Sequence, residues 1–311
     1  MDIVELLGLA SYSPSPHAEA LTPLAMNSPI PYPEDLAAQV ERALQEDIGG
    51  GDLTAVLIPA ARAGRASVIT REPAILCGVP YVNAVFAQLD ATVRVDWEVA
   101  EGDAVVADQL IFTVAGPARS LLTGERTALN FLQLLSATAT AAHAFAVLIE
   151  DTACRVLDTR KTIPGLRSAQ KYAVRVGGGQ NHRLGLFDAI LIKENHIMAA
   201  GSIALAVAAA RASAAGTREG VPVEVEVENL EELRQAIAAG ADIAMLDEFA
   251  LEDMREAVAI NRGSPHPLKL EASGSVTKET IRAIALTGGG ILTLTSESLQ
   301  NRDSSLLATV Q

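Results

Sequence analysis

Carboxylates alternate with valines between Val223 and Glu228, where the chain reads VEVEVE. In a β-strand alternate side chains face opposite sides, so the valines and the glutamates lie on different faces. Inside a parallel barrel the glutamates point inward, and burying an unpaired carboxylate is costly. At least one of them is therefore expected to meet a cation, a metal ion or ligand hydroxyls. A strand with one solvated face is the alternative.

Basic residues concentrate in one stretch of an otherwise acidic chain. Eight of the 24 Lys and Arg residues lie between Arg155 and Lys193. Three recur every four residues, at Arg167, Lys171 and Arg175, a spacing typical of a solvated helix face. The others stand at strand ends or beside glycines, where arginine forks suit carboxylates and phosphates. The sequence predicts an anion pocket built from Arg160, Lys161, Arg183 and Lys193.

Two glycine-containing loops could bring backbone amides close to an anion. Gly177–Gly179 precedes His182 and Arg183, although such a triplet also ends helices. Ser273-Gly274-Ser275 follows a strand and precedes a helix. That position is typical of a phosphate site at a helix N-terminus.

The elements that must position these residues are alternating strands and helices. Repeated βα units predict a parallel sheet, and six of them indicate a barrel or an incomplete one. Active sites of such barrels lie at the C-terminal ends of the strands, where the polar residues gather here. The candidate strands are 155–158, 189–193, 222–227, 242–246, 269–272 and 290–294.

The N-terminal half has a different pattern. Residues 1–30, rich in Ser and Pro, predict a poorly ordered extension. Short β-like runs between Ala66 and Gly116 surround one short helix, which indicates an antiparallel α+β module. A helix, broken once at most, is expected from Pro117 to about Glu150.

Composition excludes several classes of protein. The 311 residues carry a net charge of −14 with a pI near 4.8, which disfavours nucleic acid and anionic membranes as partners. The two cysteines form no disulfide framework or metal motif. The N-terminus lacks a secretory signal, so a cytoplasmic location is expected.

These residues also carry a resemblance to the quinolinate phosphoribosyltransferase family. The 40-residue segment 158–197, DTRKTIPGLRSAQKYAVRVGGGQNHRLGLFDAILIKENHI, is the most specific match. The other matching segments are EDIGGGDLT (46–54), GERTALNFLQLLS (124–136), VEVEVENLEEL (223–233), AGADIAMLDEF (239–249) and LEASGSV (270–276).

The resemblance implies a fold of class α/β, with an N-terminal α/β sandwich at 31–135 and an open, incomplete TIM-like α/β barrel at 136–295. Residues 296–311 would pack back on the sandwich. It implies that quinolinate and phosphoribosyl pyrophosphate give nicotinate mononucleotide, pyrophosphate and CO₂, in de novo NAD synthesis. Mg²⁺ as cofactor and assembly as a homodimer or a higher homo-oligomer are implied as well.

The resemblance also assigns roles by position. Lys161, Glu226 and Asp247 match catalytic residues, with Mg²⁺ near the two carboxylates. Arg126 matches an arginine contributed across the dimer interface. The residues matched to quinolinate binding are Arg126, Thr159, Arg160, His182, Arg183 and Lys193. Those matched to the phosphoribosyl group are Lys161, Glu226, Asp247, Ser273, Gly274, Ser275, Thr293, Leu294 and Thr295.

Two departures from the family pattern stand out. Between Gly288 and Glu297, Thr295 replaces a strand-end glycine, so weaker 5′-phosphate binding is expected, and glycine at this position should lower the KM for the donor. Asp247-Glu248 replaces the usual Asp-Asn. Two alternatives stay open: a related phosphoribosyltransferase acting on another heterocyclic acid, and a barrel that binds phosphorylated metabolites without turnover.

Overall fold

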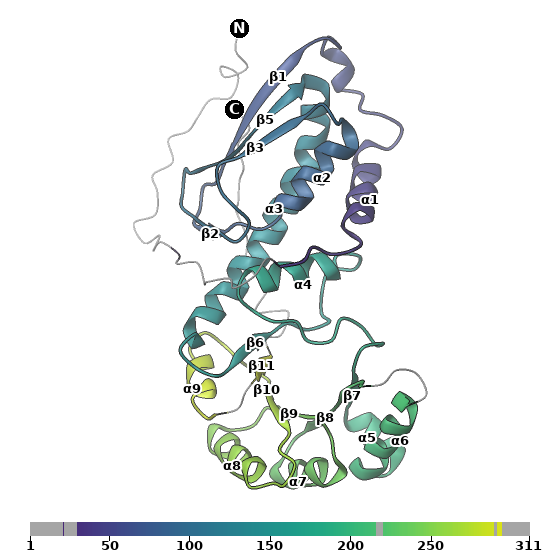
Figure 1. The fold of residues 1–311 in the computed structure, drawn as a ribbon, viewed down its shortest axis with the longest axis vertical. Helices are drawn as coiled ribbons and strands as arrows, with labels where there is room; N and C mark the ends of the chain where they lie inside the picture. The colour runs from purple at the N-terminus through teal and green to yellow at the C-terminus, as the bar shows by residue number, and fades with distance from the viewer. Residues whose placement is uncertain (1–20, 22–29, 216–219, 289–290, 294–311) are drawn as a thin grey trace. The chain divides into compact units, whose positions relative to one another are not determined.

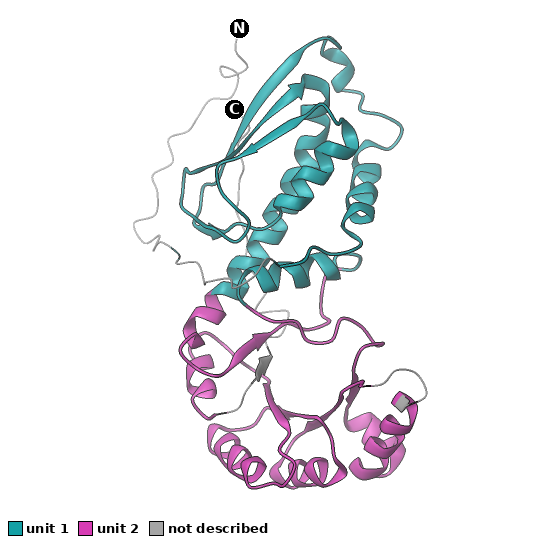
Figure 2. Ribbon diagram, viewed as in Figure 1, with its two compact units in different colours: residues 1–143, 164–178, 302–311 teal, residues 144–163, 179–301 magenta. Residues whose placement is uncertain are grey.

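The computed structural model describes residues 21, 30–215, 220–288 and 291–293. The chain divides into two compact units, coloured separately in Figure 2. The first comprises residues 1–143, 164–178 and 302–311, and the second comprises 144–163 and 179–301. The sequence predicted a domain boundary between residues 135 and 136. The structure differs from this prediction mainly because residues 164–178 belong to the first unit. The predictions for 1–30 and 296–311 fall almost wholly outside the described residues.

An antiparallel sheet and several helices form the first unit (Figure 1). The sheet has the order β1-β5-β3, with a separate antiparallel pair of β2 and β4. Side chains of β3 alternate between the two faces of the sheet, because Arg94 and Asp96 are exposed while Val95 and Trp97 are half-buried. The strands are β1 (Ala63–Ile69), β2 (Ala74–Ile75), β3 (Arg94–Trp97), β4 (Ala104–Val105) and β5 (Leu110–Pro117).

Apolar faces of the helices pack with this sheet into one core. That core includes Val68 and Phe112 from the strands, Phe86 from α2 and Leu129 from α3. The helix expected at 117–150 is a single long α3 that is followed directly by a 3-10 turn. The helical segments are α1 (Leu36–Ile48), η2 (Ala55–Leu57), α2 (Val79–Leu89), α3 (Ala118–Ala146) and α4 (Arg167–Val176).

One prediction about helix α4, that its basic residues form a solvated face, is wrong. Lys171 is 1% exposed, so the spacing of Arg167, Lys171 and Arg175 does not mark a solvated face. The next residue, Tyr172, is also 1% exposed and belongs to the core of the first unit. Its hydroxyl donates to Glu101 at 2.9 Å. A period of four identifies one helix face but not which side of the helix is covered.

Six parallel strands form the sheet of the second unit, within one or two residues of the predicted runs. Their order is β6-β11-β10-β9-β8-β7, so β6 and β7 are the two edges of an open barrel. The strands are β6 (Arg155–Leu157), β7 (Ile190–Ile192), β8 (Val223–Val227), β9 (Ile243–Asp247), β10 (Lys269–Ser273) and β11 (Ile291–Thr293).

Helices surround these strands on the outside (Figure 1). Val223, Val225 and Val227 are fully buried in a core that includes Leu233 and Ala236 of the following helix. The predicted valine face of this strand is thus confirmed, and the opposite face points into the barrel. The helical segments are η3 (Val147–Ile149), α5 (Glu194–Ala200), α6 (Ile203–Ala215), α7 (Leu230–Ala239), α8 (Leu251–Arg262) and α9 (Ile281–Ala285).

Helix α3 with its 3-10 extension is long and apolar enough to span a membrane by length and composition. Its most apolar window is 61% buried inside the protein, however. Burial of that kind is typical of a core helix that packs against a sheet.

Candidate active site

An open cavity of about 470 Å³ lies at the C-terminal ends of the barrel strands. It is the place where a parallel barrel builds its active site. The residues at its wall come from segments far apart in the sequence. Those that the sequence singled out and that line it are Thr159, Arg160, Lys161, His182, Arg183, Lys193, Glu226, Asp247, Ser273, Gly274 and Ser275.

A buried aspartate orders the loop that carries the cations. Asp158, 3% exposed, follows β6 directly. One carboxylate oxygen accepts from the backbone N–H of His182 at 2.9 Å, and the other accepts from the Asn181 side chain at 2.6 Å. The end of β6 therefore fixes the backbone from which His182 and Arg183 project.

Two buried carboxylates meet the His182 ring. Its Nε2 atom lies 2.9 Å from Glu224 and 3.6 Å from Glu271, and these glutamates are 1% and 0% exposed. The ligand atoms of the three side chains lie within 4.8 Å of one another. Glu224 therefore meets a histidine ring, whereas the prediction that a glutamate of VEVEVE meets a cation is confirmed for Glu226, which contacts Lys193.

A second glutamate of the same strand pairs with Lys193, which follows β7. The ammonium group of Lys193 contacts Glu226 Oε2, and the two side chains are 49% and 16% exposed. The pKa of the Asp247 carboxyl, at the end of β9, is raised by burial and then by the like charges of Glu226 and Glu248. This wall of the cavity therefore crowds carboxylates that a bound cation would relieve.

The residues that follow β6 and β7 supply the cations of the cavity lining. Burial lowers the pKa of Arg183, and the nearby charge of Arg160 lowers it further. The Arg183 guanidinium donates to the carbonyl of Ala189 at 3.2 Å, which holds its position. Two guanidinium groups close enough to repel each other are stabilised by an anion between them.

Some predicted residues lie elsewhere. Arg126 is exposed on α3 of the first unit and is not among the residues that line the cavity. Thr293 ends β11, and its side chain is not described. Leu294 and Thr295 lie outside the described residues, as does most of the divergent segment from Gly288 to Glu297.

Two interpretations of glycine loops need correction. Gly177 caps α4, and a Cβ atom there would lie 2.2 Å from the carbonyl oxygen of Ala139, so the triplet ends a helix against α3. The Ser273–Ser275 loop does not open a helix directly. Helix α9 begins only at Ile281 and has five residues. Any anion at this loop would depend on side chains and amides of the loop itself.

The sequence reasoning missed Glu248 and Glu271 as cavity residues. A usable signal existed for Glu271, since Leu270 and Ala272 on either side of it pack into the core. Strand alternation then directs Glu271 to the barrel interior, as it does for Glu224. His196, which lies just beyond the basic stretch, instead accepts the backbone N–H of Lys193 at 2.9 Å and caps α5.

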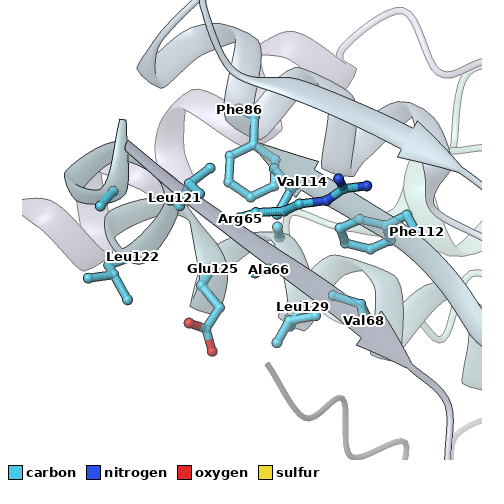
Figure 3. A pocket seen from close by; sticks show the side chains of 13 residues that line it. Arg65, Ala66, Val68, Phe86, Phe112, Val114, Leu121, Leu122, Glu125 and Leu129 are labelled. Carbon is cyan, nitrogen blue, oxygen red and sulfur yellow. The ribbon is translucent and has the colours of Figure 1, made fainter. Parts of the chain in front are cut away.

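The first unit contains a different kind of cavity (Figure 3). It is about 80 Å³ in volume and lies between β1, β5 and the helices α2 and α3. Its lining is apolar apart from Arg65 and Glu125, and burial raises the pKa of Glu125. The volume and lining suit a packing gap beneath a sheet, so the barrel cavity is the candidate active site.

Fold and site together define an α/β-barrel enzyme for small, multiply anionic substrates. The matching sequence families are the quinolinate phosphoribosyl transferase N-terminal domain over residues 52–136 and the C-terminal domain over residues 138–302. The chain belongs to the quinolinate phosphoribosyl transferase family.

Individual relatives agree with this membership. A probable nicotinate-nucleotide pyrophosphorylase [carboxylating] of Synechocystis sp. is 42% identical over 253 residues, 80% of this chain and 83% of the relative. The corresponding Bacillus subtilis protein is 40% identical over 267 residues, 85% and 90% of the two chains. The solved nicotinate-nucleotide pyrophosphorylase of Francisella tularensis is 47% identical, with a TM-score of 0.83 over 91% of this chain and 98% of that one.

Proposed function

We propose that this chain transfers the phosphoribosyl group of phosphoribosyl pyrophosphate to quinolinate, with loss of CO₂, to give nicotinate mononucleotide and pyrophosphate. The observation that carries the proposal is one cavity whose lining combines guanidinium and ammonium groups, which follow β6 and β7, with carboxylates at the ends of β8 and β9. A dicarboxylate acceptor suits the cations, and a sugar that develops positive charge suits the carboxylates. The names of the relatives, carboxylating pyrophosphorylases, support the same reaction.

The acceptor would be held by charge pairing with the cations of the cavity lining. Arg160 and Arg183 offer planar forks for the two carboxylates of quinolinate, and His182, whose Nε2 atom contacts Glu224, lines the same cavity. Holding both carboxylates fixes the direction of the pyridine nitrogen lone pair toward the sugar. Orientation of this kind is a large share of the rate in a displacement reaction.

Bond breaking at the sugar would use the carboxylates of the cavity lining. As the bond between ribose C1 and the pyrophosphate oxygen breaks, positive charge develops on the sugar, and Glu226 and Asp247 are suited to stabilise it. The pyridine nitrogen donates its electron pair to C1, and pyrophosphate leaves with the electrons of the broken bond. The positively charged ring then accepts the electron pair released when CO₂ leaves, and a proton takes the place of CO₂.

Magnesium is the proposed cofactor, and the donor set fits it. Mg²⁺ prefers oxygen ligands and is usually held by one or two carboxylates together with substrate phosphates. Asp247 and Glu226 would hold it, since burial and then the like charges of Glu226 and Glu248 raise the pKa of Asp247, and a bound cation would oppose this shift. When bound, the ion neutralises charge on the departing pyrophosphate.

Assembly and location complete the proposal. We propose a homodimer or a larger homo-oligomer in which Arg126, exposed on α3, serves the site of the partner subunit. A cytoplasmic location is proposed from the two buried cysteines, which form no disulfide bond. The alternatives of another heterocyclic acid and of binding without turnover are outcomes of the assay below.

The test follows pyrophosphate and CO₂ together in the presence of quinolinate, phosphoribosyl pyrophosphate and Mg²⁺. Equal release of both products is expected with quinolinate, and none with nicotinate. Pyrophosphate without CO₂, or turnover of nicotinate, would point to another acceptor, and binding without turnover would reject the enzymatic proposal.

A pair of variants on one strand links the activity to this cavity. Arg160→Met should raise the KM for quinolinate on the order of 10- to 100-fold, since it removes a charged fork from the acceptor side. Arg155→Met is the matched control, because Arg155 lies at the other end of β6 and bonds to the carbonyls of Thr152 and Cys154. Equal effects of the two variants would place the acceptor elsewhere.

A further inference from the structure

Glu248 has an unusual backbone for its residue type. It follows β9 directly with φ at 52°, in the left-handed region, which Asp108 alone shares among the described residues other than glycine. This conformation is strained for a residue with a side chain such as glutamate. The backbone N–H of Glu248 donates to the carbonyl of Ser273 at 3.1 Å, which fastens it to the end of β10.

The Glu248 carboxylate lies against the loop that follows β10. Ser275 Oγ donates to Glu248 Oε1 at 3.2 Å. A Cβ atom on Gly274 would lie 2.7 Å from the carboxyl carbon and 2.8 and 2.9 Å from the two oxygens. The carboxylate therefore lies directly on Gly274, whose φ of 121° itself favours glycine. The loop proposed for a phosphate already has an anionic group packed on it.

The surrounding charges do not compensate for this carboxylate. Asp247, Glu226 and Glu248 line the same part of the cavity, with Lys193 already paired to Glu226. A phosphate that reached Ser275 would meet the Glu248 carboxylate as a like charge. Like charges within a few ångströms of each other repel, and water screens part of this repulsion because Glu248 and Ser275 are exposed.

We infer that Glu248 is a specificity-determining residue for the phosphate end of the donor, because its carboxylate occupies the Ser273–Ser275 loop and has to leave before a phosphate binds. Its departure breaks the Ser275–Glu248 hydrogen bond and frees the hydroxyl to donate to the incoming phosphate. Glu248 therefore weakens the binding of any phosphate group that lacks further contacts in the cavity. This inference rests on the proposed function, together with the family resemblance that matches the loop to the phosphoribosyl group of the donor.

Two substitutions of Glu248 test the inference. Glu248→Gln removes the charge at nearly constant size, and Glu248→Ala removes the whole group. Both should lower the dissociation constant of inorganic phosphate, measured by calorimetry without quinolinate or Mg²⁺, by about five- to tenfold. The KM for phosphoribosyl pyrophosphate should fall by a similar factor, with the KM for quinolinate unchanged.

The matched control is Glu252→Gln, which makes the same change in net charge. Its side chain is 83% exposed in the first turn of α8 and is not part of the cavity wall. It should leave phosphate binding as in the parent chain. Adding Ser275→Ala to Glu248→Gln should cancel the gain, because the freed hydroxyl is then missing.

Unchanged or weaker phosphate binding in both Glu248 variants would overturn the inference. A raised KM for the donor would overturn it too, because Glu248 would then hold the donor instead of competing with it. Phosphate binding is measured without turnover, so this measurement does not depend on whether the chain catalyses the proposed reaction. Tighter phosphate binding in a chain that releases no pyrophosphate would reject the function and keep the inference.

Discussion

Carboxylates are buried in both units, but their surroundings differ. In the first unit, Glu101 accepts from the backbone N–H groups of Gly78 and Val79 at 2.8–3.1 Å and from the Tyr172 hydroxyl at 2.9 Å. Burial still raises the pKa of Glu101, while these hydrogen bonds act in the opposite direction. The chain itself supplies the donors that this charge requires.

In the second unit the carboxylates are crowded together. Glu226 and Glu248 both raise the pKa of Asp247, and Glu224 Oε1 has no hydrogen-bond partner at 1% exposure. Leaving such groups without donors costs stability, so their retention indicates a gain elsewhere. The comparison separates a structural carboxylate, satisfied within the fold, from functional ones that a ligand must satisfy.

Among the variants of these carboxylates, Asp247→Asn should cause the largest loss of catalytic activity. Asparagine cannot stabilise the positive charge that develops on the sugar, so kcat should fall on the order of 10²- to 10³-fold. Initial rates of pyrophosphate release at saturating substrates measure this. Asp253→Asn, on exposed α8, is the control and should match the parent chain. A fall of less than fivefold in Asp247→Asn would remove Asp247 from the catalytic groups.

Glu101→Ala should give the reverse result, with a large loss of stability and little loss of catalysis. Two backbone N–H groups and the Tyr172 hydroxyl would lose their acceptor, at about 1 kcal/mol or more each, so unfolding should become easier by roughly 3 kcal/mol. Urea denaturation measures the change. In folded protein, a kcat as low as that of Asp247→Asn would contradict the distinction between the two carboxylates.

Glu224→Gln should fall between these extremes. Glutamine keeps an acceptor for the His182 ring but removes a negative charge that favours the charged form of Arg183. The KM for quinolinate should rise about tenfold, while the free energy of unfolding changes by less than about 1 kcal/mol. Glu228→Gln is the control, since Glu228 follows the same strand and is exposed. A large change in stability with constant KM would make Glu224 structural, like Glu101.

Sequence reasoning predicted the barrel well because local patterns decide it. The strands β6–β11 are short apolar runs between helical segments, and their C-terminal ends must meet on one edge of a parallel sheet. Thr159, Lys193 and Asp247 therefore came together as expected. Such patterns carry no information about which helix face another element covers, so the burial of Lys171 was missed.

Tertiary contacts also explain the remaining misses. The position of Glu248 depends on a left-handed backbone and on space above Gly274, neither of which follows from residue order. The glycine triplet was ambiguous for a similar reason, because only the approach of α3 to Gly177 identifies it as a helix end. Residue types predicted which groups enter the site, whereas their hydrogen-bond partners required the fold.

The smallest predicted effect concerns stability as a function of pH. The pKa of Asp247 is raised above its ordinary value of 3.8, so the folded chain holds this proton more tightly than the unfolded chain. The resulting stability is complete below the ordinary pKa and is lost as pH rises through the pKa of the folded state. The Asp247→Asn variant does not lose this stability. The Tm of the variant minus the Tm of the parent chain should therefore be slightly larger at pH 7 than at pH 4.

The size of that difference is modest, because Asp247 is only partly buried and water screens its neighbours. We expect the Tm difference between Asp247→Asn and the parent chain to increase by on the order of 1–2 °C from pH 4 to pH 7. Melting curves without Mg²⁺ or substrates are required, because a bound cation would relieve the same repulsion. An equal or lower relative Tm would mean that the Asp247 carboxylate is satisfied within the fold, which would remove the contrast with Glu101.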